Sequence, residues 1–335
     1  MKSQLILPHE DLCRPKPKLT LRERFRFYRH YLKILFQARK LPIRGRLDLA
    51  QAVYNGTYNG NMHIKYDFGE LIRELNFRSP EQVLFDHTKS LDVQWQQLAQ
   101  FFDAQGEVLC KPLYGEQGKG IVVIANRSEL RDFLSSSSEE YLVQEFVPPV
   151  KDVRYIYHKA YGVTYRVCYE KRRTIVIGDG KSTVLDLIKS HSELPKHLKQ
   201  KMLKKNKHRS SEVLKNGVEE CLALTGNISN GAYSVLVKNK ELEAIDHVML
   251  TLIDRMKAEK GISLSTYCFD IGTLVEFDEN TPYRIEDFVF YEFQIPFGFT
   301  GYLDSSELDG VKNKTIFMLS NSIQYNWLNR NPKTT

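Results

Sequence analysis

Lysines and glycines stand between two apolar runs in the segment KPLYGEQGKG, residues 111–120. Lys111 ends the first run, and Gly115, Gly118 and Gly120 follow it. Glycine lets backbone N–H groups approach an anion, because no Cβ stands in the way. The pattern predicts a flap over a polyphosphate, with Lys111 as a cationic ligand; an ordinary β-hairpin is the alternative. It is not a Walker A loop, since G-x-x-x-x-G-K-[ST] is absent.

A second candidate for ligand binding is YLVQEFVPPVKD, residues 141–152. A strand that runs into a proline pair leaves backbone groups unpaired beside an apolar wall, which suits the edge of an adenine ring. Asp152 would then accept hydrogen bonds from ribose hydroxyls. The alternative is an edge strand and a loop without a ligand.

Acidic residues stand among apolar, strand-like residues at two places, Asp270 in CFDIG and Glu292 in YEFQIPFG. Carboxylates in such surroundings are rarely buried unless they are paired or bound to a metal. Glu292 and Gln294 would project from one face of a strand, so a carboxylate and an amide oxygen could approach one hard cation. Beside a triphosphate, oxygen ligands indicate Mg²⁺; a structural salt bridge is the alternative.

The remaining polar residues of interest are Arg154, Arg166, Lys171 and the segment GNISNGA at 226–232. Arginine suits bidentate binding of a carboxylate or a phosphate. Asn227 could orient such a group or complete the shell of a metal. For each of them a surface ion pair is the alternative.

These residues need a framework of short strands and a few helices. Helix-like and strand-like periods alternate from about residue 82 to a proline hinge at 148–152. Beyond the hinge we expect a hairpin that turns at 161–162, a strand, turn and helix at 174–191, and a helix over 241–261 that ends at a glycine. Strands are expected at 265–272, 283–290 and 291–297. The pattern predicts an α+β protein with two lobes and a cleft between them.

Composition limits the function classes. The chain has 335 residues, of which 42% are hydrophobic, and no apolar run of a length that would cross a membrane. Its five cysteines are scattered, which disfavours a disulfide framework or a zinc site, and a cytoplasmic location is expected. The net charge of +7 is concentrated in two basic segments, 21–40 and 195–209. Each is a solvated face or a surface for an anionic partner or membrane; nucleic acid is disfavoured because no recognition module accompanies the charge.

The order of these motifs resembles the ATP-grasp superfamily, and most closely the ATP-grasp module of cyanophycin synthetase and related glutamate-ligase-like enzymes. The matching segments, in order, are KPLYGEQGKGIVV, YLVQEFV, KDVRYIYH, YEKRRTIVIGDGKSTVLDLI, GNISNGA, FDIG and YEFQIPFG. The resemblance implies two α+β lobes that clasp ATP, after a helical or irregular N-terminal region. The expected divisions are 1–80, 81–148 with the glycine loop, 149–310 with the metal site, and a tail at 311–335.

The activity that the resemblance implies is ATP-dependent ligation of a small-molecule or peptide carboxylate to an amine through an acyl phosphate. The cofactors would be ATP and Mg²⁺, with two ions expected and Mn²⁺ as an alternative. The implied ATP ligands are Lys111, the loop residues Gly115, Gln117, Gly118, Lys119 and Gly120, the strand residues Gln144, Glu145, Phe146 and Val147, and Asp152. The implied metal ligands are Asp270, Glu292 and Gln294, and the implied catalytic residues are Arg154, Lys171 and Asn227.

The sequence departs from the family pattern at several points. Gln294 stands where the family usually has asparagine, and Lys171 stands where arginine is usual. The family's second ATP-facing lysine has no clear counterpart, and Lys89 is a candidate. Two further functions therefore remain open: a small-molecule kinase with the same ATP site, and a non-catalytic binding protein that keeps the fold.

Overall fold

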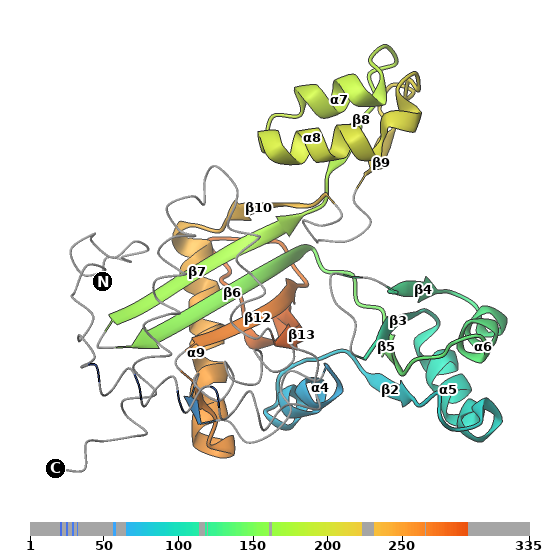
Figure 1. The fold of residues 1–335 in the computed structure, drawn as a ribbon. Coiled ribbons are helices and arrows are strands. Elements are labelled where there is room, and N and C mark those ends of the chain that lie inside the picture. Colours follow the sequence, from blue (N-terminus) through green and yellow to red (C-terminus); the bar gives the residue numbers. More distant parts are fainter. Residues whose placement is uncertain are drawn as a thin grey trace.

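The computed structural model describes residues 65–113, 118, 120–160, 163–222, 231–264 and 266–293, together with 56–57 and four positions before residue 33. These residues form two antiparallel sheets with helices, plus a helical arm (Figure 1). The expected α+β class is confirmed. Among the described residues no helix is both long and apolar enough to cross a membrane.

The smaller lobe is a four-stranded sheet in the order β2–β5–β3–β4, with two helices packed against it. Its elements are β2 (Gln82–Phe85), α5 (Leu91–Gln105), β3 (Val108–Pro112), β4 (Val122–Ile124), α6 (Arg127–Ser135) and β5 (Tyr141–Glu145). Helix α6 begins at Asn126, whose side chain accepts a hydrogen bond from the backbone N–H of Glu129 at 2.8 Å. Buried Leu98, Leu130 and Val143 belong to its core.

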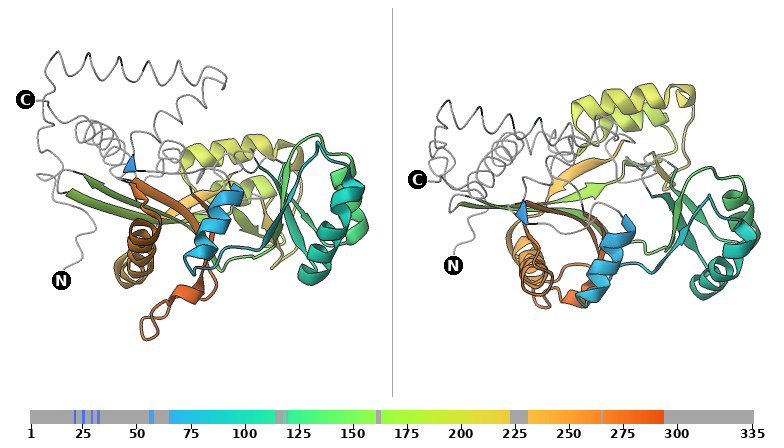
Figure 2. Two further views of the ribbon diagram at one scale, coloured as in Figure 1. Left: turned by 90° about the horizontal axis from the view of Figure 1, so that it is seen from below. Right: turned by 60° about the horizontal axis from the view of Figure 1, so that its bottom comes forward.

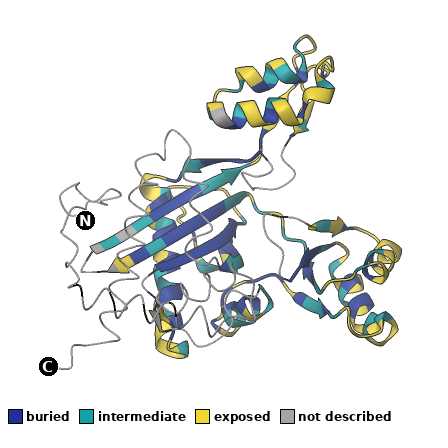
Figure 3. Ribbon diagram, viewed as in Figure 1, coloured by how far each residue is buried: buried dark blue, intermediate teal, exposed yellow. Residues whose placement is uncertain are grey.

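The larger lobe is a five-stranded sheet in the order β10–β7–β6–β12–β13. Its strands are β6 (Lys151–Ala160), β7 (Val163–Arg172), β10 (Tyr233–Leu236), β12 (Thr266–Thr273) and β13 (Phe288–Phe293). Helices α4 (Lys65–Glu74) and α9 (Asn239–Lys260) cover one face, and their apolar side chains form one core with Val153, Tyr155 and Phe269. The central strands are buried along most of their length (Figure 3).

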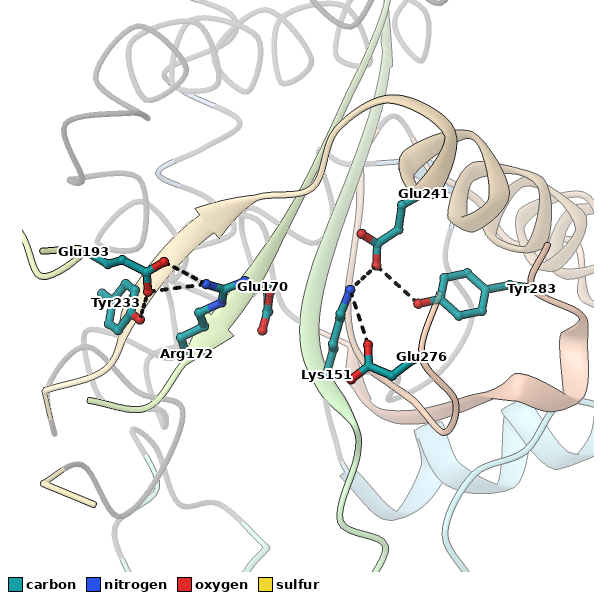
Figure 4. Close-up of polar contacts among 8 residues, drawn as sticks. All are labelled: Lys151, Glu170, Arg172, Glu193, Tyr233, Glu241, Glu276 and Tyr283. Carbon is teal, nitrogen blue, oxygen red and sulfur yellow. Dashed lines mark hydrogen bonds and ion pairs between the residues drawn. The ribbon is translucent and has the colours of Figure 1, made fainter. Parts of the chain in front are cut away.

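Polar contacts also fasten α9 to this sheet. Lys151, at the start of β6, lies 2.7 Å from a carboxylate oxygen of Glu241 on α9, and the Tyr283 hydroxyl donates to the same oxygen (Figure 4). The helix ends at Gly261, whose φ of 64° is the left-handed conformation of a glycine C-cap. The expected end of this helix is confirmed.

A helical arm, residues 175–222, is inserted between β7 and β10. It consists of β8 (Ile175–Ile177), α7 (Val184–Ser190), α8 (Lys196–Lys205), the short 3-10 helix η1 (Lys207–Arg209) and β9 (Glu219–Cys221). Its own core includes Val184, Leu198 and Met202. The sheet lies between two sets of helices: α9 is on one side, and the arm rises on the other (Figure 2).

One sequence expectation is wrong. In place of a strand over 283–290 and a second one from 291, residues 283–293 contain the 3-10 helix η3 (Ile285–Asp287) and one strand, β13 (Phe288–Phe293); residues 294–297 lie outside the described part of the chain. The sequence analysis also missed β2, which pairs with β5 at the edge of the smaller sheet. Of the basic segment 21–40 the structure describes four exposed helical residues, Leu21, Phe25, Arg29 and Leu32, so its partner stays a prediction.

Candidate active site

The face of the large sheet that is turned away from α9 carries a row of charged side chains. Strand pairing sets the row: Asp270 on β12 lies opposite Arg154 on β6, and on its other side opposite Glu292 on β13. Since side chains alternate between the two faces of a strand, the neighbours Val153, Tyr155, Phe269 and Ile271 point into the α9 core. We call Asp152, Arg154, Lys171, Asp270 and Glu292 the charged row.

Arg154 and Asp270 form a buried, bidentate ion pair. The Nε and Nη2 atoms of Arg154 each donate to a different carboxylate oxygen of Asp270 at 2.6 Å. Burial alone would raise the pKa of Asp270, but the Arg154 guanidinium and the Lys171 ammonium outweigh burial and hold that pKa well below its usual range. Asp270 is therefore a carboxylate at every pH at which the protein would work.

Lys171 joins the two aspartates of the row. Its Nζ lies 2.7 Å from Asp152 Oδ1 and 3.3 Å from Asp270 Oδ1. Burial raises the pKa of Asp152, and the Lys171 charge opposes that shift. Asp152, expected at a ribose, is thus engaged by a lysine of the neighbouring strand.

A β-bulge places Glu292 in the row. Ile271 pairs with Phe290, but Asp270 pairs with Glu292, so β13 has one extra residue at Tyr291. Without the bulge, strict alternation from Phe288 and Phe290 would turn Glu292 toward the α9 core. The hydroxyl of Tyr291 donates to the carbonyl of Val147 at 2.8 Å, which ties the bulge to the proline hinge.

The lysine of the smaller lobe meets the carboxylates of the larger one. Lys111, on β3, is buried. Burial lowers its pKa to about 8, the negative charges of Glu292 and Asp270 work against that shift, and the charge of Lys65 adds to it. Burial raises the pKa of Glu292, and the charge of Asp270 adds to that shift. The charge of Lys111 in the smaller lobe and the charges of Glu292 and Asp270 in the larger lobe therefore act on one another; their roles toward ATP and a metal stay predictions.

Lys65 is the site residue that the sequence analysis missed. It begins α4, and its Nζ donates to the carbonyl of Pro112, the residue after Lys111, at 3.0 Å. The candidate Lys89 instead pairs with Asp86 at 3.1 Å and has a 65% exposed side chain. Lys65, and not Lys89, is therefore the lysine whose charge acts on Lys111 and Glu292.

The strand residues expected at an adenine ring lie where the two lobes join. The backbone N–H of Glu145 donates to Glu81 at 2.8 Å, and its side chain pairs with Arg78 at 3.2 Å. Gln144 is buried, with its amide 3.4 Å from that of Gln82. Phe146 and Val147 are partly buried, and the contact of these strand residues with an adenine ring stays a prediction.

Other expected site residues fall outside the described part of the chain. These are Gly115, Gln117, Lys119, Asn227 and Gln294, and their roles stay predictions. Within the loop, Gly118 and Gly120 have φ values of 70° and 71°. A Cβ on Gly120 would lie 2.8 Å from Pro112 Cγ, so glycine is required there by both conformation and space.

Arg166 does not belong to the site. It pairs with Asp246 of α9 at 2.7 Å, and Asp246 also accepts a hydrogen bond from Tyr155 at 2.7 Å. Arg166 lies on the α9 side of the sheet, where it helps to fix that helix.

Comparison with protein families gives one match. Residues 85–207 match the family described as prokaryotic glutathione synthetase, ATP-grasp domain. The match covers less than half of the chain. The expected superfamily is confirmed, and the finer resemblance to cyanophycin synthetase stays a prediction.

Solved structures of several synthetases and ligases are similar at low sequence identity. A bifunctional glutathione synthetase from Pasteurella multocida is 16% identical with a TM-score of 0.46, and the match covers 79% of this chain and 38% of that one. D-alanyl-alanine synthetase A from Vibrio cholerae is 13% identical with a TM-score of 0.45, covering 79% and 66%. D-alanine–D-alanine ligase from Bacillus anthracis is 11% identical with a TM-score of 0.49, covering 86% and 77%. No curated protein sequence matches.

The donor set of this ATP-grasp site fits a hard cation in part. Glu292 is a partly buried carboxylate that has neither a hydrogen bond nor an ion pair with any described residue, and it stands opposite Asp270. Oxygen donors so placed suit Mg²⁺. Within the described ranges no group of three His, Cys, Asp or Glu side chains gathers around one point, so further ligands would come from ATP, water or the expected Gln294.

Proposed function

We propose that the protein is an ATP-dependent carboxylate–amine ligase that forms an amide through an acyl phosphate. The observation that carries the proposal is the meeting of Lys111 and Lys65 with Glu292 and Asp270 where the two lobes face each other. Two cations beside two carboxylates can bind a polyphosphate and its metal at once. The match to an ATP-grasp domain supports ATP as that polyphosphate.

The chemistry divides into two balanced steps. A carboxylate oxygen of one substrate attacks the γ-phosphorus of ATP, the bond to the β-phosphate oxygen breaks, and acyl phosphate and ADP form. The amine nitrogen of a second substrate then attacks the acyl carbon, phosphate leaves, and the amine loses a proton. Catalysis of this kind is mostly positioning and charge neutralisation.

The residues take roles that follow from their contacts. Lys111, Lys65 and the glycine loop would hold the phosphates, while Glu292 and Asp270 would hold Mg²⁺. The metal would neutralise the charge that develops on the β- and γ-phosphates. Arg154 keeps the Asp270 carboxylate in one orientation through its two hydrogen bonds.

Lys171 would position Asp152 and Asp270. With Arg154 and Asn227 it also remains a candidate for binding the acyl phosphate. We expect sustained ADP release only with Mg²⁺, a suitable carboxylate and an amine, because the acyl phosphate of the first step must react with the amine before the next turnover begins.

The test is an ADP-release screen of the full chain with Mg²⁺, ATP and a panel of carboxylates and amines, followed by mass spectrometry of the products. Lys111→Met and Glu292→Gln should abolish turnover, because each removes a charge at the phosphates. Lys89→Met is the matched control and should keep it. Full activity of either site variant would refute the site, and a stable phosphorylated product formed without an amine would identify a kinase instead.

A further inference from the structure

The helical arm carries the strongest charge asymmetry in the described part of the chain. Residues 196–209 contain six lysines and one arginine, and no acidic residue. Helix α8 turns Leu198 and Met202 into the core of the arm. Because α-helical positions repeat every 3.6 residues, its opposite side presents Lys196, Gln200 and Lys204, all of them exposed.

Three of these lysines have no counter-ion within the arm. Lys196, Lys204 and Lys207 form no ion pair with any residue that the structure describes, although other basic residues nearby do have partners. Arg209 pairs with Glu212 at 2.6 Å and with Glu220 at 2.8 Å, and Lys199 donates to the carbonyl of Lys189 at 2.8 Å. Within the part of the chain that the structure describes, no acidic side chain therefore pairs with these three lysines.

A polar latch fixes the start of α8 against the large sheet. Arg172, at the end of β7, lies 3.2 Å from Glu193 and 2.9 Å from Glu170, and the hydroxyl of Tyr233 on β10 donates to Glu193 (Figure 4). Glu193 lies just before α8 in the chain. The latch thus ties the basic helix to the two strands at the edge of the charged row.

The arm also rises on the side of the sheet that carries the charged row, opposite α9 (Figure 2). Ser234, which pairs with Lys171 across β10 and β7, faces the same side. Its hydroxyl is buried and has no hydrogen-bond partner among the residues that the structure describes. A buried hydroxyl in this state is a ready contact for a bound polar group.

We propose that the outward side of α8 binds an acidic peptide segment of a ligase substrate and delivers its carboxylate to the charged row. The inference rests on the proposed ligase function. A ten-residue helix is about 15 Å long, which matches about five residues of extended peptide. The complementary chemistry is a run of Asp or Glu side chains facing Lys196, Lys204 and Lys207.

Two other polyanions fit the surface less well. A membrane-binding helix needs an apolar side to enter the bilayer, and α8 has buried its apolar side chains in the arm. Single-stranded nucleic acid is usually held by aromatic side chains as well as by charge, and residues 192–222 contain no Phe, Tyr or Trp. Peptide carboxylates are also the groups on which a ligase acts.

The test measures binding without ATP, so that it does not depend on catalysis. The anisotropy of a fluorescein-labelled deca-glutamate peptide is followed against the full chain in low salt, where exposed charges are least screened. The charge reversal K196E/K204E should weaken peptide binding at least about tenfold. The affinity of the neutral variant K196Q/K204Q should lie between that of the wild type and that of K196E/K204E. The matched control is K159E/K257E, which reverses the charge of two exposed lysines outside the arm and should change binding less than about twofold.

The outcomes separate the two proposals. Selective loss in the α8 variants supports the docking surface, and binding without any amide formation would keep that surface while removing the ligase function. Amide formation from small substrates with no saturable peptide binding would overturn the docking surface alone. Equal loss in the control variant, or α8-dependent binding of phosphatidylserine vesicles in place of the peptide, would also overturn it.

Discussion

Replacing Asp270 by asparagine should destabilise the protein, because the change removes the carboxylate to which the buried Arg154 guanidinium donates two hydrogen bonds. The side chain of Arg154 is 5% exposed and donates two hydrogen bonds to Asp270 at 2.6 Å. Removing one partner of a buried ion pair typically costs about 3–5 kcal/mol. We expect a loss of that size in the free energy of unfolding, measured by urea denaturation with EDTA and without nucleotide.

The double variant D270N/R154M separates the ion pair from the ligand role of Asp270. If the two losses were independent, the double variant would lose about 6–10 kcal/mol, the sum of two such changes. With both charges gone, no charge of the pair is left uncompensated, so we expect a loss of about 2 kcal/mol or less. Lys171 keeps its contact with Asp152 in both variants.

ATP turnover should group the three variants differently from stability. ATP turnover should be absent in D270N and in D270N/R154M, because both lack the carboxylate that we assign to Mg²⁺. R154M alone keeps the carboxylate and should retain a measurable rate. The reasoning is refuted if D270N is as stable as the wild type, or if the double variant is as unstable as the sum of the singles.

Two more predictions test the second lysine and a buried histidine. Lys65→Met should raise the KM for ATP about tenfold or more, the effect of losing one charge-assisted contact to a phosphate, while Lys89→Met leaves it unchanged. His158 is 1% exposed, and burial lowers its pKa to about 4. As the pH falls from about 6.5 toward 4, the unfolded chain therefore binds a proton at this histidine that the folded protein does not bind. The wild type should lose about 3 kcal/mol of stability over that range. His158→Asn should lack this loss in urea titrations at several pH values; identical pH dependence in the two proteins would contradict the assignment.

Much of the candidate site could be predicted from the sequence, because the order of the motifs along the chain indicates which residues belong together. Lys111, Asp270 and Glu292 were expected together, and the structure brings them together across the two lobes. Strand parity would also have removed Arg166 from the candidates. Arg166 and Lys171 are five positions apart on one strand, an odd number, so they must face opposite sides of the sheet.

Lys65 and the bulge at Tyr291 could not have been found this way. Lys65 lies far from the other motifs in the chain, and only the packing of α4 between β2 and β13 brings its ammonium to Pro112. The bulge reverses the alternation of β13, so that Glu292 leaves the face shared by Phe288 and Phe290. No residue type signals this extra position, because the bulge depends on pairing with β12.

The charged row is better explained by positioning than by stability. A buried ion pair contributes little net stability compared with apolar side chains of the same volume, so Arg154 and Asp270 need not be charged for the sheet to fold. What the pair does is hold one carboxylate in a fixed orientation beside Glu292, which makes no ion pair with any described residue. A fixed carboxylate beside Glu292 would suit the binding of a metal-bound polyphosphate. The buried ion pair therefore serves to orient the Asp270 carboxylate. We expect the double variant D270N/R154M to fold well but to fail to turn over ATP.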